Sequence, residues 1–379
     1  MSSVDTVAAT RMKATCRSED LAEKLAVAGR GVSTRTSVHV LTGMLLRAEG
    51  ERLSIAATDM EISLRLGLDA AVEDEGAVVV PGRLLVDIAR LLPPGEVVLE
   101  FRPEEARAHL TCGSASYSLH TFNAEDFPRL PDADAGETFA VDRTAFLDTV
   151  QKVSRSASRD ESRPVLTGIL VRFEDAKLVM AATDSYRLSV KETPLTRGPG
   201  RELEAIVPAR ALAELVRIAQ ATSVETLEIG VHENQVVFDV DSVVLTARRI
   251  DGQFPNYKQL VPESFEAEVE LPRDEFLDVV RRTSLMAQRK SPLRVRFHDG
   301  EVTVTAQTQD VGEARESLPV RYAGDPLEIG FNADFLRDGL ESVSDDRVRL
   351  KLISPLRPGL IQGDAEDFLY LIMPIRLAG

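Results

Sequence analysis

Residues 40–65 read VLTGMLLRAEGERLSIAATDMEISLR, and residues 165–190 read VLTGILVRFEDAKLVMAATDSYRLSV. The two stretches align without a gap at an offset of 125 residues, and 12 of their 26 positions are identical. A weaker third copy, LRVRFHDGEVTVTAQTQD, begins at Leu293. Because solenoid repeats have periods of only about 20 to 50 residues, this spacing predicts three copies of a whole domain.

Flanking segments repeat in the same order, as VVVPGRLLVDIARLL, AIVPARALAELVRIA and IGFNADFLRDGLESV. A chain of 379 residues has room for two or three domains. The stretches 128–137 (PRLPDADAGE) and 261–268 (VPESFEAE) are acidic, contain proline and fit joints between copies. We therefore expect domains at residues 1–132, 133–262 and 263–379.

Each copy combines helical and strand patterns. Residues 146–158, FLDTVQKVSRSAS, place apolar side chains at helical spacing. Apolar and polar residues alternate, as is typical of strands, in five segments: GILVRFED, KLVMAATD, TLEIGVHE, QVVFDVDS and VVLTARRI. A second helix is expected to open at the proline of VPAR (207–210), because a residue in the first turn needs no free N–H. The predicted fold class is α+β, with three similar domains, each made of two helices packed against antiparallel sheets.

The composition bounds the location and the partners. With 44% hydrophobic residues, no run of eighteen apolar residues and no signal-peptide core at its start, the chain is expected to be a soluble cytoplasmic protein that binds no membrane. Two cysteines, Cys16 and Cys112, cannot form a disulfide framework. A net charge of −16 argues against nucleic acid as a partner, unless the basic residues gather on one face.

The sequence lacks the motifs of the common enzyme classes. It has no GxxxxGK[ST] phosphate loop, no GxSxG elbow, no CxxC pair and no HExxH spacing among its five histidines. Asp59 and Asp184 are the same position in two copies, so an Asx hydrogen bond in a turn fits them better than acid–base catalysis. We predict no catalytic residue, no metal site and no cofactor.

Basic residues recur at matching places of the copies, and spacings of three, four or seven put them on single helix faces. An ordinary solvated face explains any one pair, whereas the repetition favours a sequence-independent contact with duplex phosphates. The chain has no Trp and no aromatic stripe among these cations, so base stacking is not expected. The cations with this spacing are Arg83, Arg90, Lys152, Arg155, Arg159, Arg210 and Arg217. Arg281 and Arg282 join them because residues 276–296 of the third copy carry six basic residues against one acid, Asp278.

Three motifs carry a resemblance to a known family: ATDSYRL (182–188), FPNY (254–257) and YLIMPIRL (370–377). With the threefold repeat, they make the chain similar to the bacterial DNA sliding clamp, the beta subunit of DNA polymerase III, along essentially its whole length. The resemblance implies that two chains close head to tail into a ring around duplex DNA. Such a ring tethers the replicative polymerase without catalysing a reaction. It also implies that Arg35 faces DNA together with the helix cations named above.

The resemblance further implies an apolar pocket between the second and third domains. This pocket receives short peptides from the polymerase alpha subunit, the clamp loader, and repair and translesion polymerases. Aliphatic side chains with Met373 would form it, and Arg187 and Arg376 would orient the peptide. A last strand that completes a core is the other interpretation of residues 371–377. The matching positions are Leu166, Thr183, Ser185, Tyr186, Arg187, Leu188, Pro255, Gln259, Leu260, Leu356, Pro358, Leu371, Ile372, Met373, Pro374, Ile375, Arg376 and Leu377.

A head-to-tail homodimer needs an interface between the first domain of one chain and the third domain of the other. We expect Tyr117 and Leu119, on an outer strand, to meet Leu285 and Met286 of the partner, because an apolar edge strand needs cover. A clamp paralogue kept for repair or for resistance to an inhibitor stays open as an alternative. An enzyme built from three domains is disfavoured by the missing motifs.

Overall fold

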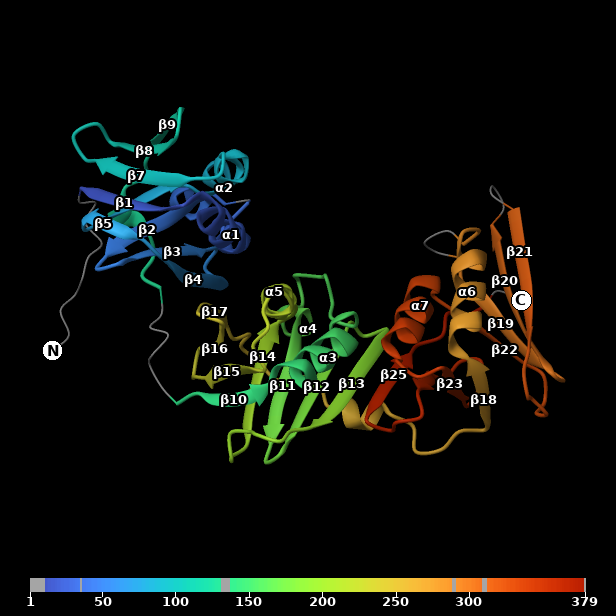
Figure 1. Cartoon of the computed structure of the whole chain (residues 1–379). Helices are drawn as coiled ribbons and strands as arrows, with labels where there is room; N and C mark the ends of the chain where they lie inside the picture. The colour runs from blue at the N-terminus through green and yellow to red at the C-terminus, as the bar shows by residue number, and fades with distance from the viewer. Residues whose placement is uncertain (1–10, 35, 131–136, 288–290, 309–311, 378–379) are drawn as a thin grey trace. The chain divides into compact units, whose positions relative to one another are not determined.

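The computed structural model describes residues 11–34, 36–130, 137–287, 291–308 and 312–377 (Figure 1). The chain separates into two compact units. Unit 1 comprises Met1–Arg143 and Arg210–Arg249, and unit 2 comprises Thr144–Ala209 and Ile250–Gly379. The described strands form two sheets in each unit, and every pairing between them is antiparallel.

Unit 1 contains a five-stranded and an eight-stranded sheet. The first has the order β5 (Ala71–Asp74), β1 (Met12–Arg17), β7 (Glu96–Arg102), β8 (Arg107–Cys112), β9 (Ala115–His120). The second has the order β10 (Phe139–Asp142), β15 (Thr226–Val231), β16 (Gln235–Val240), β17 (Val243–Arg248), β4 (Ile62–Asp69), β3 (Arg52–Thr58), β2 (Gly43–Glu49), β6 (Gly76–Pro81). The helices are α1 (Ser18–Ala28) and α2 (Gly82–Leu91). Helix α5 (Ala209–Gln220) also belongs to this unit, except for its first residue.

Unit 2 contains an eight-stranded and a four-stranded sheet. The first has the order β14 (Leu203–Pro208), β11 (Gly168–Glu174), β12 (Lys177–Thr183), β13 (Arg187–Pro194), β25 (Phe368–Ile372), β24 (Gly359–Gln362), β23 (Arg347–Leu352), β18 (Ala267–Pro272). The second has the order β21 (Gly312–Pro319), β20 (Glu301–Thr308), β19 (Leu293–His298), β22 (Leu327–Phe331). The helices are α4 (Pro164–Thr167), α6 (Arg273–Ser284) and α7 (Ala333–Ser342). Helix α3 (Arg143–Ser154) also belongs to this unit, except for its first residue.

Each eight-stranded sheet joins strands from two copies of the repeat. In unit 1, β4 of the first copy pairs with β17 of the second, and Ser63 lies opposite Thr246. In unit 2, β13 of the second copy pairs with β25 of the third, and Leu188 lies opposite Leu371. The middle copy therefore supplies strands to both units. The expected boundary at residues 132 and 133 lies outside the described residues, and all the boundaries stay predictions.

The helices bury one face against the sheets, as their apolar spacing predicts. On α2 the buried side chains include Leu85, Val86 and Ile88, while Arg83 and Arg90 are exposed. In the third copy, α6 and α7 pack on a core of large side chains that includes Phe276, Phe297, Phe331 and Tyr370. Full burial of one such side chain stabilises the fold by about 1.5–3 kcal/mol.

Two predicted helix boundaries are wrong. The helix expected over 146–158 ends at Ser154, because Ser and Thr compete for backbone hydrogen bonds and weaken a helix; the buried Ser156 hydroxyl instead bonds that of Ser189 at 2.6 Å. The helix expected to open at Pro208 begins one residue later. Pro208 is the last residue of β14, an outermost strand of its sheet, where the missing N–H breaks no ladder.

Candidate functional site

The aspartates that end equivalent strands organise equivalent turns. After β12, the Asp184 Oδ1 atom accepts hydrogen bonds from the backbone N–H groups of Tyr186 (2.9 Å) and Arg187 (3.0 Å). After β3, the Asp59 Oδ1 atom accepts from the backbone N–H groups of Glu61 (3.1 Å) and Ile62 (2.9 Å). The predicted Asx role is confirmed, and each carboxylate belongs to its own turn rather than to a catalytic pair.

A hollow of about 420 Å³ opens beside the Asp184 turn, and we call it the apolar hollow. The turn, the start of β13, the 3₁₀ segment Tyr257–Leu260, the loop between β23 and β24 and the end of β25 surround it. Its lining residues are Thr183, Ser185, Arg187, Leu188, Gln259, Leu260, Val261, Pro262, Leu356, Arg357, Pro358, Leu371 and Met373.

The apolar hollow has a buried floor and an exposed rim. Leu188 and Leu371 are buried in the core of the shared sheet. On the rim, Leu260, Leu356 and Met373 are 51%, 62% and 40% exposed. Apolar rim side chains left in water over an apolar floor are typical of a site that receives an apolar ligand group. Most of the sequence-predicted pocket residues meet here, from segments that are far apart in the chain.

The other predicted pocket positions lie outside this lining. Ile372 is fully buried and pairs with Arg187 in the sheet, so its place in the pocket prediction is wrong. The Ile375 N–H donates to the carbonyl oxygen of Gly330, so this segment runs beside β22. Residues 373–377 thus do not continue β25 as a last core strand. The positions outside the lining are Leu166, Tyr186, Pro255, Ile372, Pro374, Ile375, Arg376 and Leu377.

Sequence reasoning missed three lining residues. Val261 and Pro262 follow Leu260 directly, and Arg357 lies between two residues that were predicted. Arg357, rather than Arg376, therefore joins Arg187 as a cation of the hollow. Val261 and Arg357 are immediate chain neighbours of predicted residues, and Pro262 lies two positions after Leu260.

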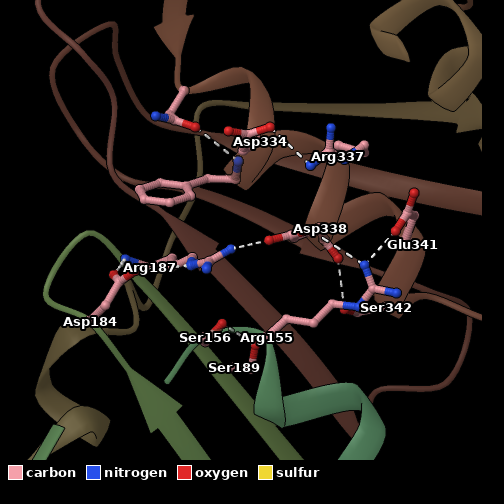
Figure 2. A network of polar contacts seen from close by, with 12 residues as sticks. Arg155, Ser156, Asp184, Arg187, Ser189, Asp334, Arg337, Asp338, Glu341 and Ser342 are labelled. Carbon is pink, nitrogen blue, oxygen red and sulfur yellow. Dashed lines mark hydrogen bonds and ion pairs between the residues drawn. The ribbon is translucent and has the colours of Figure 1, made fainter. Parts of the chain in front are cut away.

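Arg187 is held between two carboxylates and a ring (Figure 2). Its guanidinium lies 3.0 Å from Asp184 Oδ2, 2.5 Å from Asp338 Oδ2 and 4.3 Å from the centre of the Phe335 ring. Burial disfavours the charge, but Tyr370 and the two carboxylates more than offset it and raise the pKa of Arg187. Arg187 is thus a fixed positive charge at the edge of the apolar hollow.

An unbroken chain of ion pairs leads from Arg187 to the exposed side of α6 and α7. Asp338 also contacts Arg155 Nη1 at 3.4 Å, and Arg155 pairs with Glu341 (Figure 2). Glu341 in turn lies 3.0 Å from Arg281 Nη2. Burial alone would raise the pKa of Glu341, but the guanidinium groups of Arg281 and Arg155 lower it. Phosphates that approach Arg155 or Arg281 must therefore compete with carboxylates of the protein.

The other cationic candidates fall into two groups. Arg155 and Arg159 lie beyond the end of α3, so the prediction that they share its helix face with Lys152 is wrong. Four cations have acidic partners, namely Lys152 with Asp148, Arg210 with Asp59, Arg217 with Glu214 and Arg282 with Glu316. Among the predicted DNA-facing cations, Arg83, Arg90 and Arg159 are exposed and form no ion pair in the described part of the chain. Arg35 lies outside the described residues.

The residues predicted for a dimer interface differ in their exposure. Leu285 is 78% exposed at the end of α6, and Met286 packs partly against the core of the third copy. Tyr117 is half-buried on β9, the last strand of its sheet. Leu119 is only 6% exposed, so the prediction that it offers an apolar patch on the edge is wrong. Strand alternation turns the side chains of Tyr117 and Leu119 to the same, inner face, where Leu119 lies next to Met12.

The described residues contain no cluster of three or more His, Cys, Asp or Glu side chains that could hold a metal ion. Burial, with Asp20 nearby, raises the pKa of the Cys16 thiol to about 12, so the nucleophilic thiolate is disfavoured.

Among the helices that the structure describes, none is long and apolar enough to span a bilayer.

Three similar α+β domains built on antiparallel sheets match the fold of DNA sliding clamps. Models of the DNA polymerase III beta subunit match residues 12–131 (N-terminal domain), 140–256 (central domain) and 258–376 (C-terminal domain). The chain belongs to this family, the beta sliding clamps, which are processivity factors without catalytic activity. The predicted family and fold class are confirmed.

Individual relatives match over nearly the whole chain. The beta sliding clamp of Streptomyces coelicolor is 35% identical, over 97% of this chain and 100% of its own length. The beta sliding clamp homolog GriR of Streptomyces muensis is 31% identical, over 94% of this chain and 97% of its own. The crystal structure of the sliding clamp from Bacillus subtilis superimposes with a TM-score of 0.92 at 25% identity, over 97% and 100% of the two chains.

Proposed function

We propose that two copies of this sliding clamp close head to tail around duplex DNA, and that the apolar hollow of unit 2 anchors the proteins the ring serves. These clients are the alpha subunit of the replicative polymerase, the clamp loader, and repair and translesion polymerases. The ring works in the cytoplasm, on the nucleoid. The single observation that carries the anchoring role is the exposed rim of Leu260, Leu356 and Met373 over the buried Leu188 and Leu371.

The chemistry of the apolar hollow fits a short peptide with apolar anchors. The rim leucines and Met373 are shielded from water when an apolar side chain enters, which drives binding. Met373 can repack around different peptides because its thioether side chain is flexible and unbranched. Arg187 is fixed by its carboxylates, so it can orient a polar group of the peptide at no further cost in conformational entropy.

The proposed DNA contact rests on arginine and lysine facing phosphates, without readout of bases. Such a contact tolerates sliding, because every step along the duplex offers the same phosphates. The net charge of −16 discourages DNA from binding elsewhere on the surface. The proposed DNA-facing residues are Arg35, Arg83, Arg90, Lys152, Arg155, Arg159, Arg210, Arg217, Arg281 and Arg282.

The proposed homodimer covers two strands that end their sheets, β9 in unit 1 and β21 in unit 2. Edge strands present unpaired backbone groups and favour pairing with another chain. Tyr117 on β9, together with the exposed Leu285 near β21 and Met286, would contribute apolar contacts. Light scattering is expected to give twice the 41.5 kDa mass of one chain, and a stable monomer at micromolar concentration would contradict closure.

Calorimetry with a synthetic peptide from the clamp-binding segment of a replicative polymerase tests the anchoring role. In the double variant Leu260→Ala and Met373→Ala, we expect the affinity to fall at least about tenfold, since each truncation removes apolar contact area. Leu91→Ala is the matched control, because Leu91 is exposed but lies outside the hollow. Unchanged affinity in a folded double variant would place the peptide site elsewhere.

A further inference from the structure

Unit 1 contains a second hollow, of about 370 Å³, beside the Asp59 turn, and we call it the polar hollow. Its strands β3, β4 and β17 match β12, β13 and β25 of unit 2. Ser63 pairs with Thr246, as Leu188 pairs with Leu371. The repeat has therefore produced the frame of the apolar hollow a second time.

The match extends to single backbone bonds. The N–H of Arg248 donates to the carbonyl oxygen of Glu61 at 2.9 Å, and the N–H of Met373 donates to that of Tyr186 at 2.8 Å. Arg248 thus occupies the place that Met373 occupies in unit 2. Ser63 and Thr246 likewise replace the two floor leucines, so hydroxyl groups line a surface that is aliphatic in the other copy.

Two arginines of the polar hollow carry charges that no carboxylate neutralises in the described part of the chain. Arg129 and Arg248 both line it, are exposed, and form no ion pair in the described part of the chain. Glu61 adds one negative charge to the lining, so the net charge of the lining is positive. In a protein of net charge −16, an anionic partner is repelled by most of the surface and is attracted where unpaired arginines meet.

An apolar edge lies beside these cations. Met60 is 59% exposed on the turn, and Leu130 is part of the same lining. A bare anion such as phosphate would leave this apolar surface uncovered. A peptide can cover both, because its backbone carries side chains of different chemistry a few ångströms apart.

We propose that the polar hollow is a second peptide-docking site, which takes an extended protein segment with acidic side chains next to one apolar residue. Arg129 and Arg248 bind the carboxylates, the hydroxyl groups of Ser63 and Thr246 bond the peptide backbone, and Met60 covers the apolar side chain. The proposal stands on these residues alone and does not depend on which peptide the apolar hollow binds.

Fluorescence anisotropy with the full-length chain tests this site. The probe is a fluorescein-labelled hexapeptide of sequence Gly-Asp-Leu-Glu-Asp-Gly, and its counterpart carries Lys in place of each acidic residue. We expect saturable binding of the acidic probe only. The double variant Arg129→Ala and Arg248→Ala should weaken it at least about tenfold, because it removes both cations that form charge-assisted hydrogen bonds to the carboxylates of the peptide.

Two controls separate this site from bulk charge and from the other hollow. Arg197→Ala with Arg321→Ala removes two exposed arginines that line neither hollow, and it should leave the acidic probe bound. Met373→Ala should also leave it bound, while it weakens the polymerase peptide. No saturable binding to the unaltered chain, or equal binding to the Arg129 and Arg248 double variant, would overturn the proposal. Neither result would alter the polymerase-peptide measurement, so the two proposals fail separately.

Discussion

The apolar hollow of unit 2 and the polar hollow of unit 1 share a turn, a strand pairing and a nearly equal volume, yet their linings differ in kind. Leu188, Leu371 and Met373 line the first, whereas Ser63, Thr246 and Arg248 stand at the matching places of the second. The backbone frame follows from the residues that the copies share, above all Ala-Ala-Thr-Asp. What each hollow can bind follows from the residues that they do not share.

The arginines of helix α2 in unit 1 differ in a similar way from those around the ion-pair chain of unit 2. In unit 2, Arg155, Arg187 and Arg281 are tied into one chain of ion pairs. In unit 1, Arg83 and Arg90 on α2 have no ion pair in the described part of the chain. A charge that already has a partner contributes less to binding, because the ligand must displace that partner. We therefore expect Arg155, Arg187 and Arg281 to serve stability more, and Arg83 and Arg90 to serve binding more.

The largest expected difference concerns the residue after the turn, which is Arg187 in unit 2 and Ile62 in unit 1. Arg187→Ala leaves Asp184 without its ion-pair partner and Asp338 with only the longer contact to Arg155, in a mostly buried place, so we expect a loss of about 3–5 kcal/mol. Ile62→Val removes only one methylene group and should cost about 0.5–1.5 kcal/mol. Urea denaturation of both variants measures the two losses. Equal losses of unfolding free energy would mean that the ion pairs of Arg187 do not stabilise the fold.

The floors of the two hollows give the next largest contrast. Leu188 is buried in the core of the shared sheet, so Leu188→Ala should cost about 2–5 kcal/mol. Ser63→Ala removes one hydroxyl, which bonds that of Thr58 at 2.9 Å, and should cost about 1 kcal/mol. The same denaturation curves measure this pair. A mild effect of Leu188→Ala would show that the floor of the apolar hollow is not part of the core.

The ion-pair chain of unit 2 predicts a dependence on pH. Against the opposing effect of burial, Arg281 and Arg155 hold the pKa of Glu341 below its ordinary value near 4.3 in the folded chain. The stabilisation is therefore complete above about pH 4.3 and is lost as the pH falls through the lowered pKa. Glu341→Gln should be less stable than the unaltered chain at pH 6, by about 1 kcal/mol at most, since the arginines are partly exposed. Melting curves at pH 6 and pH 3 test this, and a gap that widened on acidification would contradict it.

The smallest expected effect concerns DNA. Arg83→Ala with Arg90→Ala should lower the slope of log affinity against log salt by about one for each phosphate that is no longer neutralised, and should leave the melting temperature nearly unchanged. Arg155→Ala should change the slope less and the melting temperature more, because Arg155 is already paired. Binding to one short duplex at several salt concentrations provides the slopes. A larger slope change for Arg155→Ala would contradict the expectation that Arg83 and Arg90 contribute more to DNA binding than the paired Arg155.

The sequence predicts much of this fold, because the repeat and the alternation of apolar residues are local signals. Strands β11, β12, β15, β16 and β17 and the two Asx turns follow from such signals. The end of α3 was missed because helical spacing continues into Arg155 and Arg159, while the serines between them favour a turn. The pairing of Arg187 with Asp338 could not be predicted, since it joins residues 151 positions apart.

The existence of the polar hollow can be predicted from the sequence alone. The alignment that places Thr58 on Thr183 also places Ser63 on Leu188, so a pocket predicted at one implies a pocket at the other. Its chemistry also needed Arg129 and Arg248, which come from a joint and from a strand end. Only the folded sheet shows that they line one hollow.

The central claim is that the chain holds DNA by enclosing it, and retention on closed circular DNA tests this most directly. The clamp is loaded by its clamp loader onto a nicked circular plasmid, moved into a salt concentration that abolishes phosphate contacts, and measured before and after one restriction cut. Enclosure predicts that the clamp stays on the circle and leaves once the DNA is linear. Equal retention on both forms, or release from both, would contradict it.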